Sequence, residues 1–138
     1  MAKKSPQKIL VVDDVLLNIK ILSKTLKEHY SILVATNGAD AIELAQQNAD
    51  INLILLDIMM PDMDGYEVAT RLKADPGTMK TPIIFLTAMD KTEDEAKGLK
   101  LGAVDYITKP FNKEILKARV KTHLELEEYR TKLERKVA

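Results

Sequence analysis

The stretch Lys8-Ile9-Leu10-Val11-Val12-Asp13-Asp14 joins an uninterrupted run of branched apolar residues to two adjacent carboxylates. Four more short apolar runs follow it along the chain, at 31–35, 53–56, 83–86 and 103–107. Strands that are buried on both faces of a parallel sheet have such continuous runs, whereas half-exposed antiparallel strands alternate apolar and polar residues. The five runs therefore predict five strands of a parallel sheet.

The segments between these runs have the spacing of amphipathic helices. In the first of them, Ile19, Leu22 and Leu26 fall on one stripe. Gly102 directly follows the segment 92–101, at the position of a helix C-cap. Alternating strands and helices in a chain of this length predict an α/β fold, a doubly wound, flavodoxin-like sheet of order 2-1-3-4-5 flanked by five helices. Such sheets bind their ligands outside the carboxyl ends of the strands.

The composition excludes several classes of protein. The 138 residues predict one domain, and the balance of 21 basic and 21 acidic side chains argues against direct binding to nucleic acid or to an anionic membrane. The chain has no cysteine, which excludes disulfides and zinc–thiolate sites. Its first apolar run reaches Asp13 too soon for a signal peptide or a membrane span, so we expect a soluble, cytoplasmic protein. The only histidines, His29 and His123, are expected on solvated faces.

Three carboxylates follow predicted strands. Asp13 and Asp14 come after the first run, and Asp57 comes after the third. In a sheet of order 2-1-3-4-5 these two strands are neighbours, so the carboxylates meet at one edge. Crowded anions raise one another's pKa unless a cation neutralises them, and oxygen ligands without His or Cys suit Mg²⁺. A turn or helix-cap role would explain Asp57 alone, but the trio predicts a Mg²⁺ site.

Two further polar groups end strands at the same edge. Thr87 follows the fourth run and offers a hydroxyl, and Lys109-Pro110 follows the fifth and brings a cation. The proline permits a cis peptide bond, which would direct Lys109 back toward the carboxylates. There Lys109 could pair with a carboxylate or hold a phosphoryl oxygen. Each residue alone has an ordinary interpretation, as a strand threonine or a surface lysine, whereas together they predict a site.

These residues, on successive strand ends, resemble the receiver domains of two-component response regulators. The motif consists of Asp13-Asp14, Asp57, Thr87-Ala88 and Lys109-Pro110-Phe111. The loop 57–65, Asn18 and the stretch 102–106 match the same family. The resemblance covers about residues 7–123, which we therefore expect to form the receiver domain.

The resemblance implies a phosphorylation site. Asp57 would be the phosphoacceptor and would take its phosphoryl group from a sensor histidine kinase or a phosphotransfer protein. Lys109 would pair with a phosphoryl oxygen, and donors at Thr87 and Ala88 would bind the others.

The resemblance also implies the metal ligands. Asp14 and Asp57 would bind Mg²⁺ directly, Asp13 through a water molecule, and Met59 through its backbone carbonyl. The side chains of Met59 and Met89 would flank the phosphoryl group. Because a thioether cannot orient water by a strong hydrogen bond, we expect slow self-dephosphorylation and no other enzymatic activity.

Thr87 and Tyr106 correspond to the switch residues of the family. When Asp57 gains a phosphoryl group, Thr87 would move toward it and leave space for the ring of Tyr106. This change would alter the surface formed by the helix 92–101, the fifth strand and the last helix, and so control dimerisation or an output partner. Tyr106 alone would pass for an ordinary half-buried strand residue.

Other classes of protein use a similar sheet. A metal-dependent phosphatase with an aspartyl phosphate needs a second aspartate two residues after the nucleophile, where this chain has Met59. A nucleotide- or flavin-binding domain needs a glycine-rich loop after the first strand, where this chain has Asp13-Asp14-Val15. A structural adaptor without phosphorylation is disfavoured because every phosphorylation position is filled.

The segment 112–138 has no Gly or Pro and predicts one extended helix, with Leu116 and Val120 packed on the domain. Residues 124–138 exceed the length that the sheet needs. They carry a narrow apolar seam formed by Leu126, Tyr129, Leu133 and Val137. Two interpretations stay open: a solvated or frayed end, and a coiled coil or linker that forms a homodimer or leads to an output domain.

Overall fold

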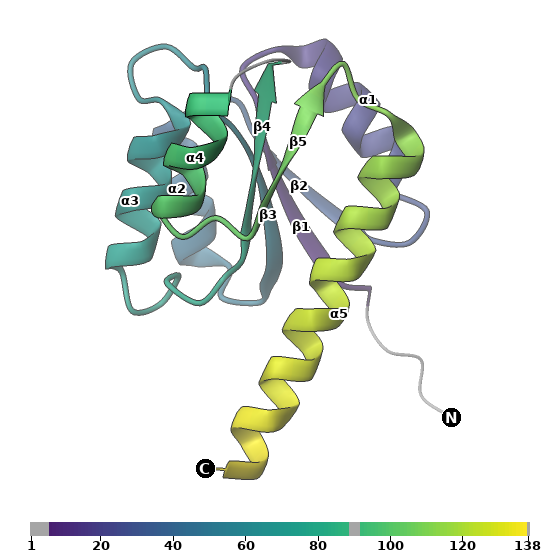
Figure 1. Ribbon diagram of the computed structural model, residues 1–138, viewed down its shortest axis with the longest axis vertical. Coiled ribbons are helices and arrows are strands. Elements are labelled where there is room, and N and C mark those ends of the chain that lie inside the picture. The colour runs from purple at the N-terminus through teal and green to yellow at the C-terminus, as the bar shows by residue number, and fades with distance from the viewer. Residues whose placement is uncertain (1–5, 89–91, 138) are drawn as a thin grey trace.

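Five parallel strands form one sheet in the order β2-β1-β3-β4-β5, as the sequence predicts (Figure 1). The computed structural model describes residues 6–88 and 92–137, apart from the side chains of 92–95, 136 and 137. The strands are β1 (Lys8–Val12), β2 (Ser31–Ala35), β3 (Ile51–Asp57), β4 (Ile83–Ala88) and β5 (Asp105–Lys109).

Helices cover both faces of the sheet (Figure 1). On one face lie α1 (Leu16–Leu26) and α5 (Lys113–Val137), and on the other lie α2 (Gly38–Gln47), α3 (Gly65–Ala74) and α4 (Thr92–Lys100). A hydrophobic core lies on each face of the sheet, and the strand β1 contributes to both. Leu10 and Val12 pack with residues of α2 and α3, whereas Ile9 and Val11 pack with residues of α1 and α5. This two-sided burial explains why the run has no polar alternation.

Gly102 ends α4, as the sequence predicts, and has a φ of +94°. The N–H of Gly102 donates to the Leu99 carbonyl and the N–H of Ala103 donates to the Gly98 carbonyl, both at 3.1 Å. These two bonds form a Schellman cap, which favours glycine at the left-handed position. Because the cap uses Ala103, β5 begins at Asp105, two residues later than the start of the apolar run.

The helix α5 is continuous and extends well beyond the sheet (Figure 1). Leu116 and Val120 are fully buried, as predicted, and Leu124 is 1% exposed. Farther along, the described seam residues are exposed, namely Leu126, Tyr129 and Leu133. Within the described ranges, no helix is both long and apolar enough to cross a membrane.

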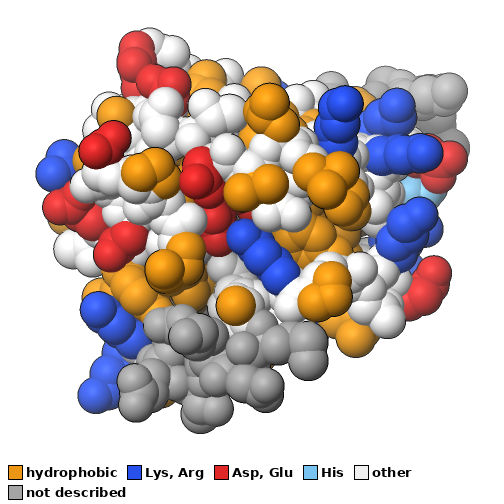
Figure 2. All heavy atoms as spheres, turned by 90° about the horizontal axis from the view of Figure 1, so that it is seen from above, with side chains coloured by type: hydrophobic (Ala, Val, Ile, Leu, Met, Phe, Trp, Pro, Cys, Tyr) orange, Lys and Arg blue, Asp and Glu red, His pale blue; other side chains and the backbone are white. Residues whose placement is uncertain are grey.

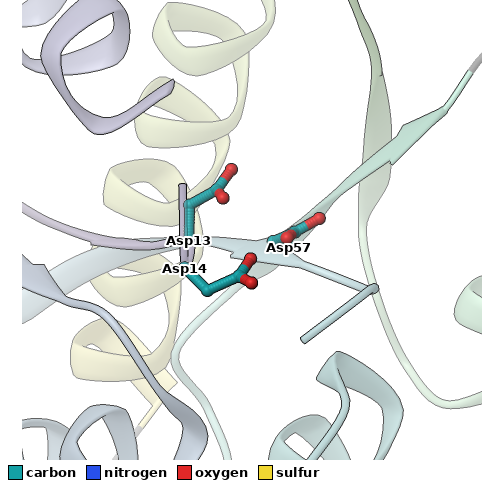
Figure 3. A group of neighbouring side chains, drawn as sticks. All are labelled: Asp13, Asp14 and Asp57. Carbon is teal, nitrogen blue, oxygen red and sulfur yellow. The ribbon is translucent and has the colours of Figure 1, made fainter. Parts of the chain in front are cut away.

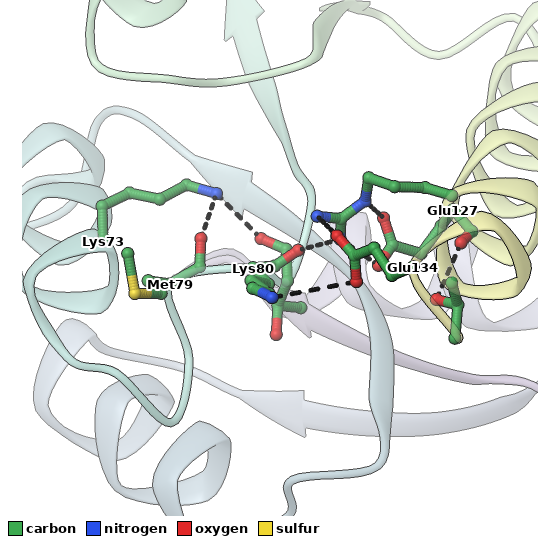
Figure 4. A network of polar contacts seen from close by, with 8 residues as sticks. Lys73, Met79, Lys80, Glu127 and Glu134 are labelled. Carbon is green, nitrogen blue, oxygen red and sulfur yellow. Dashed lines mark hydrogen bonds and ion pairs between the residues drawn. The ribbon is translucent and has the colours of Figure 1, made fainter. Parts of the chain in front are cut away.

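Charged side chains attach the far part of α5 to the turn between α3 and β4 (Figure 4). Arg130 donates to the carbonyl of Lys80 at 3.0 Å, and it pairs with Glu127 and, at 3.5 Å, with Glu134. The Lys80 ammonium lies 3.8 Å from Glu134. We call Lys80, Glu127, Arg130 and Glu134 the foot cluster.

Candidate functional site

The three carboxylates predicted from the sequence lie side by side at the carboxyl end of the sheet (Figure 3). Asp13 and Asp14 directly follow β1, and Asp57 ends the neighbouring strand β3. One oxygen of each lies within 4.8 Å of the others. Asp13 and Asp57 are 0% and 2% exposed, whereas Asp14 is exposed. We call these three carboxylates the acidic cluster.

Hydrogen bonds from the start of α1 hold Asp13 in place. The backbone N–H of Val15 donates to Oδ1 of Asp13 at 2.9 Å, and Nδ2 of Asn18 donates to Oδ2 at 3.2 Å. Asn18 matches the family in sequence, but the match alone gives it no role. The structure identifies it as the side chain that orients Asp13.

Gly65, the first residue of α3, lies directly against the end of β3. A Cβ atom at Gly65 would overlap the carbonyl oxygen of Asp57. The N–H of Gly65 donates to the Ile58 carbonyl at 2.9 Å. Only a residue without a side chain lets α3 begin this close to the acidic cluster. Gly65 ends the loop 57–65 that matches the family, but the sequence carried no signal for this close approach.

Lys109 enters the acidic cluster from β5, as predicted. Its Nζ lies 2.8 Å from Oδ1 of Asp57 and 3.2 Å from Oδ2 of Asp13. The Lys109–Pro110 peptide bond is cis, as the sequence permits. The Lys109 side chain is 24% exposed and that of Asp57 only 3%, so this ion pair is largely shielded from water.

Burial and neighbouring charges shift the pKa values of this pair. Burial raises the pKa of Asp57, the hydrogen bond from Lys109 opposes that effect, and the charge of Asp13 raises it again, to a net value of about 6. Burial alone would lower the pKa of Lys109, but the hydrogen bond and charge of Asp57, together with Asp13, outweigh it and raise the pKa. At neutral pH, Asp57 is therefore mainly a carboxylate and Lys109 an ammonium.

The acidic cluster fits a magnesium ion by the chemistry of its donors. All three groups offer hard carboxylate oxygens at mutual distances that one ion can bridge. Their combined negative charge exceeds the single positive charge of Lys109, and the exposed Asp14 leaves the cluster accessible from solvent. Met59 lies in the loop directly after Asp57, and its side chain is 73% exposed.

Thr87 and Ala88 end β4 beside the acidic cluster. Asp57 lies opposite Leu86 in the parallel pairing of β3 with β4. Thr87 is 2% exposed, and its hydroxyl donates to the Ala88 carbonyl at 2.8 Å. In this arrangement the hydroxyl is used locally and does not bind Asp57. Met89, predicted to flank the phosphoryl group, lies outside the described residues.

Tyr106 lies on β5 opposite Phe85 and is half-buried. Its backbone N–H donates to Oδ1 of Asp105 at 2.8 Å.

The prediction of a solvated His123 is wrong: its side chain is 15% exposed, and Nε2 lies 2.9 Å from Oδ2 of Asp105. This contact joins α5 to β5 across 18 positions, a pairing for which the local sequence has no signal. The side chain of His29 is 73% exposed, as predicted.

Figure 2 views the carboxyl edge of the sheet from above. Acidic side chains gather near the middle of this face, a basic side chain lies beside them, and hydrophobic side chains lie on either side. The large exposed hydrophobic residues next to the acidic cluster in the sequence are Val15, Leu16, Leu17 and Met59. Exposed apolar side chains beside a charged centre suit contact with another protein.

The family model of the response regulator receiver domain matches residues 9–121. The chain belongs to this family. Receiver domains in general are phosphoacceptors rather than enzymes, and they interact with histidine kinases.

Relatives of this receiver domain include two bacterial signalling proteins. The probable cyclic di-GMP phosphodiesterase of Vibrio cholerae is 48% identical over 117 residues, which cover 85% of this chain and 26% of that protein. The response regulator PleD of Caulobacter vibrioides is 41% identical over 116 residues, which cover 83% and 25%. The chain thus spans about a quarter of the length of these relatives.

A solved structure with the same fold is the CheY-like response regulator receiver domain protein of Methanospirillum hungatei. It has a TM-score of 0.83 and 28% sequence identity, and the match covers 91% of this chain and 99% of the other. The fold predicted from the order of apolar runs is therefore that of the family.

Proposed function

We propose that Asp57 accepts a phosphoryl group from the phosphohistidine of a sensor histidine kinase or of a phosphotransfer protein. The observation that carries this proposal is the buried Asp57 carboxylate, which lies 2.8 Å from Lys109 at the carboxyl end of the sheet. An oxygen of Asp57 attacks the phosphorus, and the phosphorus–nitrogen bond breaks. The imidazole leaves with the bonding electron pair and takes a proton from solvent, and an aspartyl phosphate forms.

Side chains around Asp57 have distinct tasks in this step. The ammonium of Lys109 keeps the buried Asp57 ionised and oriented before transfer, and it pairs with a phosphoryl oxygen afterwards. The hydroxyl of Thr87 and the backbone N–H of Ala88 donate to the remaining phosphoryl oxygens. Thr87 must then exchange its bond to the Ala88 carbonyl for a bond to the phosphoryl group.

The acidic cluster supplies the metal ligands in this proposal. Asp14 and Asp57 would hold Mg²⁺ directly, Asp13 through a water molecule, and Met59 through its backbone carbonyl. When bound, the ion supplies positive charge that offsets the charge of the transferring group. Hydrogen bonds from Asn18 and from the N–H of Val15 keep the Asp13 carboxylate oriented toward the other two carboxylates.

The movement of Thr87 makes a switch. As Thr87 turns to the phosphoryl group, the ring of Tyr106 turns into the space that Thr87 leaves. The surface formed by α4, β5 and α5 then changes, and it controls dimerisation or an output partner. Because Met59 and Met89 cannot orient an attacking water, the phosphorylated form decays slowly.

Residues 7–123 act as the receiver domain, and residues 124–138 extend α5 as a coiled coil or as a linker to an output domain. The exposed seam residues Leu126, Tyr129 and Leu133 support this division, as does the greater length of the relatives. A homodimer forms through the α4–β5–α5 surface or through α5. The protein works in the cytoplasm.

Intact-mass spectrometry with acetyl phosphate and Mg²⁺ tests the phosphoacceptor. The wild type should gain one phosphoryl mass, Asp57→Asn should gain none, and Asp62→Asn should behave as the wild type. Asp62 is a matched control because it lies in the same loop, and its φ of 69° suits asparagine. Absence of a mass gain on the wild type would contradict the proposal. Light scattering on the same samples reports whether phosphorylation changes the oligomer size.

A further inference from the structure

Arg119 on α5 contacts the proposed switch residue Tyr106 in two ways. The guanidinium donates to the backbone carbonyl of Tyr106 and, at 3.2 Å, to Oδ1 of Asp105. The carbon of the same guanidinium lies 5.6 Å from the centre of the Tyr106 ring. This separation is within the range of a cation–π interaction. A single side chain therefore holds both the backbone and the ring of Tyr106.

The backbone of Tyr106 is fixed by side chains at the edge of the sheet. The strand β5 is the last strand, so one of its sides has no strand neighbour. The N–H of Tyr106 donates to Asp105 at 2.8 Å, and the carbonyl accepts from Arg119. Asp105 is held in turn by His123 at 2.9 Å. With these hydrogen bonds in place, the ring of Tyr106 can turn while its backbone stays bound.

We propose that Arg119 is a positioning residue that sets the threshold of the Tyr106 switch. Its guanidinium holds the ring at the β5 edge, in the arrangement in which Thr87 donates to Ala88. The ring has to leave this guanidinium when it turns toward the space beside Thr87. The contact therefore stabilises one of the two arrangements and not the other. The whole free energy of the contact shifts the equilibrium between them. This inference rests on the proposed switch at Tyr106.

The fork of the arginine explains why a lysine would be a weaker substitute. Arg119 binds a carbonyl and a carboxylate while its plane stays near the ring. A lysine ammonium could keep the positive charge near the ring, but it lacks the planar fork that reaches both acceptors. Arg119→Lys should therefore retain part of the effect, and Arg119→Gln should lose it.

Fluorine NMR of the full chain labelled with 3-fluorotyrosine tests this inference. The Tyr106 resonance is assigned by its loss in Tyr106→Phe and followed during a titration with beryllofluoride, a phosphoryl mimic, in the presence of Mg²⁺. The readout is the titration midpoint, because removing a nearby cation also moves the resonance directly. His123→Gln is the matched control, since His123 binds Asp105 from the same helix.

The inference predicts a midpoint for Arg119→Gln that is lower than that of the wild type by roughly two- to five-fold. Arg119→Lys should lie between the two, and His123→Gln should match the wild type. Equal midpoints for Arg119→Gln and the wild type would overturn the inference, as would an equally lowered midpoint for His123→Gln. If the wild-type resonance does not move although acetyl phosphate adds a phosphoryl mass, the switch itself is wrong and the inference falls with it, while the phosphoacceptor stands.

Discussion

Two charged clusters lie at opposite ends of the sheet and differ in balance and burial. Among the described residues, the three carboxylates of the acidic cluster have one ammonium beside them, that of Lys109, and two of the carboxylates are buried. The foot cluster has two cations and two anions, with side chains 21% to 69% exposed. A buried excess of charge is costly until a cation or a transferred group compensates it, whereas exposed balanced pairs contribute little. The acidic cluster therefore has the character of a reactive site, whereas the foot cluster attaches α5 to the turn between α3 and β4.

Removal of the Lys109 ammonium beside the acidic cluster should give the largest loss of stability. Lys109→Met leaves Asp13 and Asp57 buried without their cation, and we expect a loss of about 2–3 kcal/mol at pH 7 without Mg²⁺. Urea unfolding in the presence of a chelator measures it. Lys80→Met removes an exposed lysine of the foot cluster and should cost less than about 1 kcal/mol. Equal losses for the two variants would break the distinction between the clusters.

The raised pKa of Asp57 predicts a pH-dependent gain in a variant. Because the pKa rises from 3.8 to about 6 on folding, the folded protein binds this proton more tightly than the unfolded chain does. Ionisation of Asp57 therefore does not lower the free energy of unfolding below about pH 4, and it lowers that free energy by its full amount above about pH 6. Asp57→Asn should match the wild type at pH 4 and exceed its stability by up to about 2–3 kcal/mol at pH 7, a net figure that already includes the bond to Lys109.

Unfolding curves from pH 4 to 8 without divalent metal check this prediction. Asp62→Asn is again the control and should follow the wild type at every pH. A stability difference between Asp57→Asn and the wild type that stays constant with pH would show that burial does not penalise the Asp57 carboxylate.

The smallest effect is expected at the foot cluster. Arg130→Ala removes the bonds to Lys80, Glu127 and Glu134. We expect a loss below about 1 kcal/mol, because all of these side chains except Glu127 are at least 40% exposed. Hydrogen exchange should become faster along α5 beyond Leu124, whereas phosphorylation by acetyl phosphate should not change. Arg135→Ala, on the same helix, is the control. A loss above about 2 kcal/mol would mean that the foot cluster stabilises the domain itself.

Much of the fold could be predicted because it depends on local patterns. The continuous apolar run of β1 reports burial on both faces, and Gly102 reports the end of α4. The meeting of Asp13 and Asp57 followed from the predicted sheet order, since parallel neighbours end at one edge. These features need only the identity of nearby residues and the general rules of parallel sheets.

The contacts that could not be predicted join distant parts of the chain through single side chains. His123 looked like a residue of a solvated helix face, but Asp105 of β5 faces it and accepts its hydrogen bond. The guanidinium of Arg130 reaches the carbonyl of Lys80 across 50 positions. The direction in which α5 crosses the sheet decides both contacts, and no local pattern of the sequence encodes that direction.

The position of the phosphoryl group tests the central claim most directly. Borohydride reduces an aspartyl phosphate to homoserine, so the protein treated with acetyl phosphate and Mg²⁺ can be reduced, digested and sequenced by mass spectrometry. The proposed function predicts homoserine at position 57 and at no other aspartate. Homoserine at position 13 or 14, or no homoserine in a protein that has gained a phosphoryl mass, would contradict the proposed function.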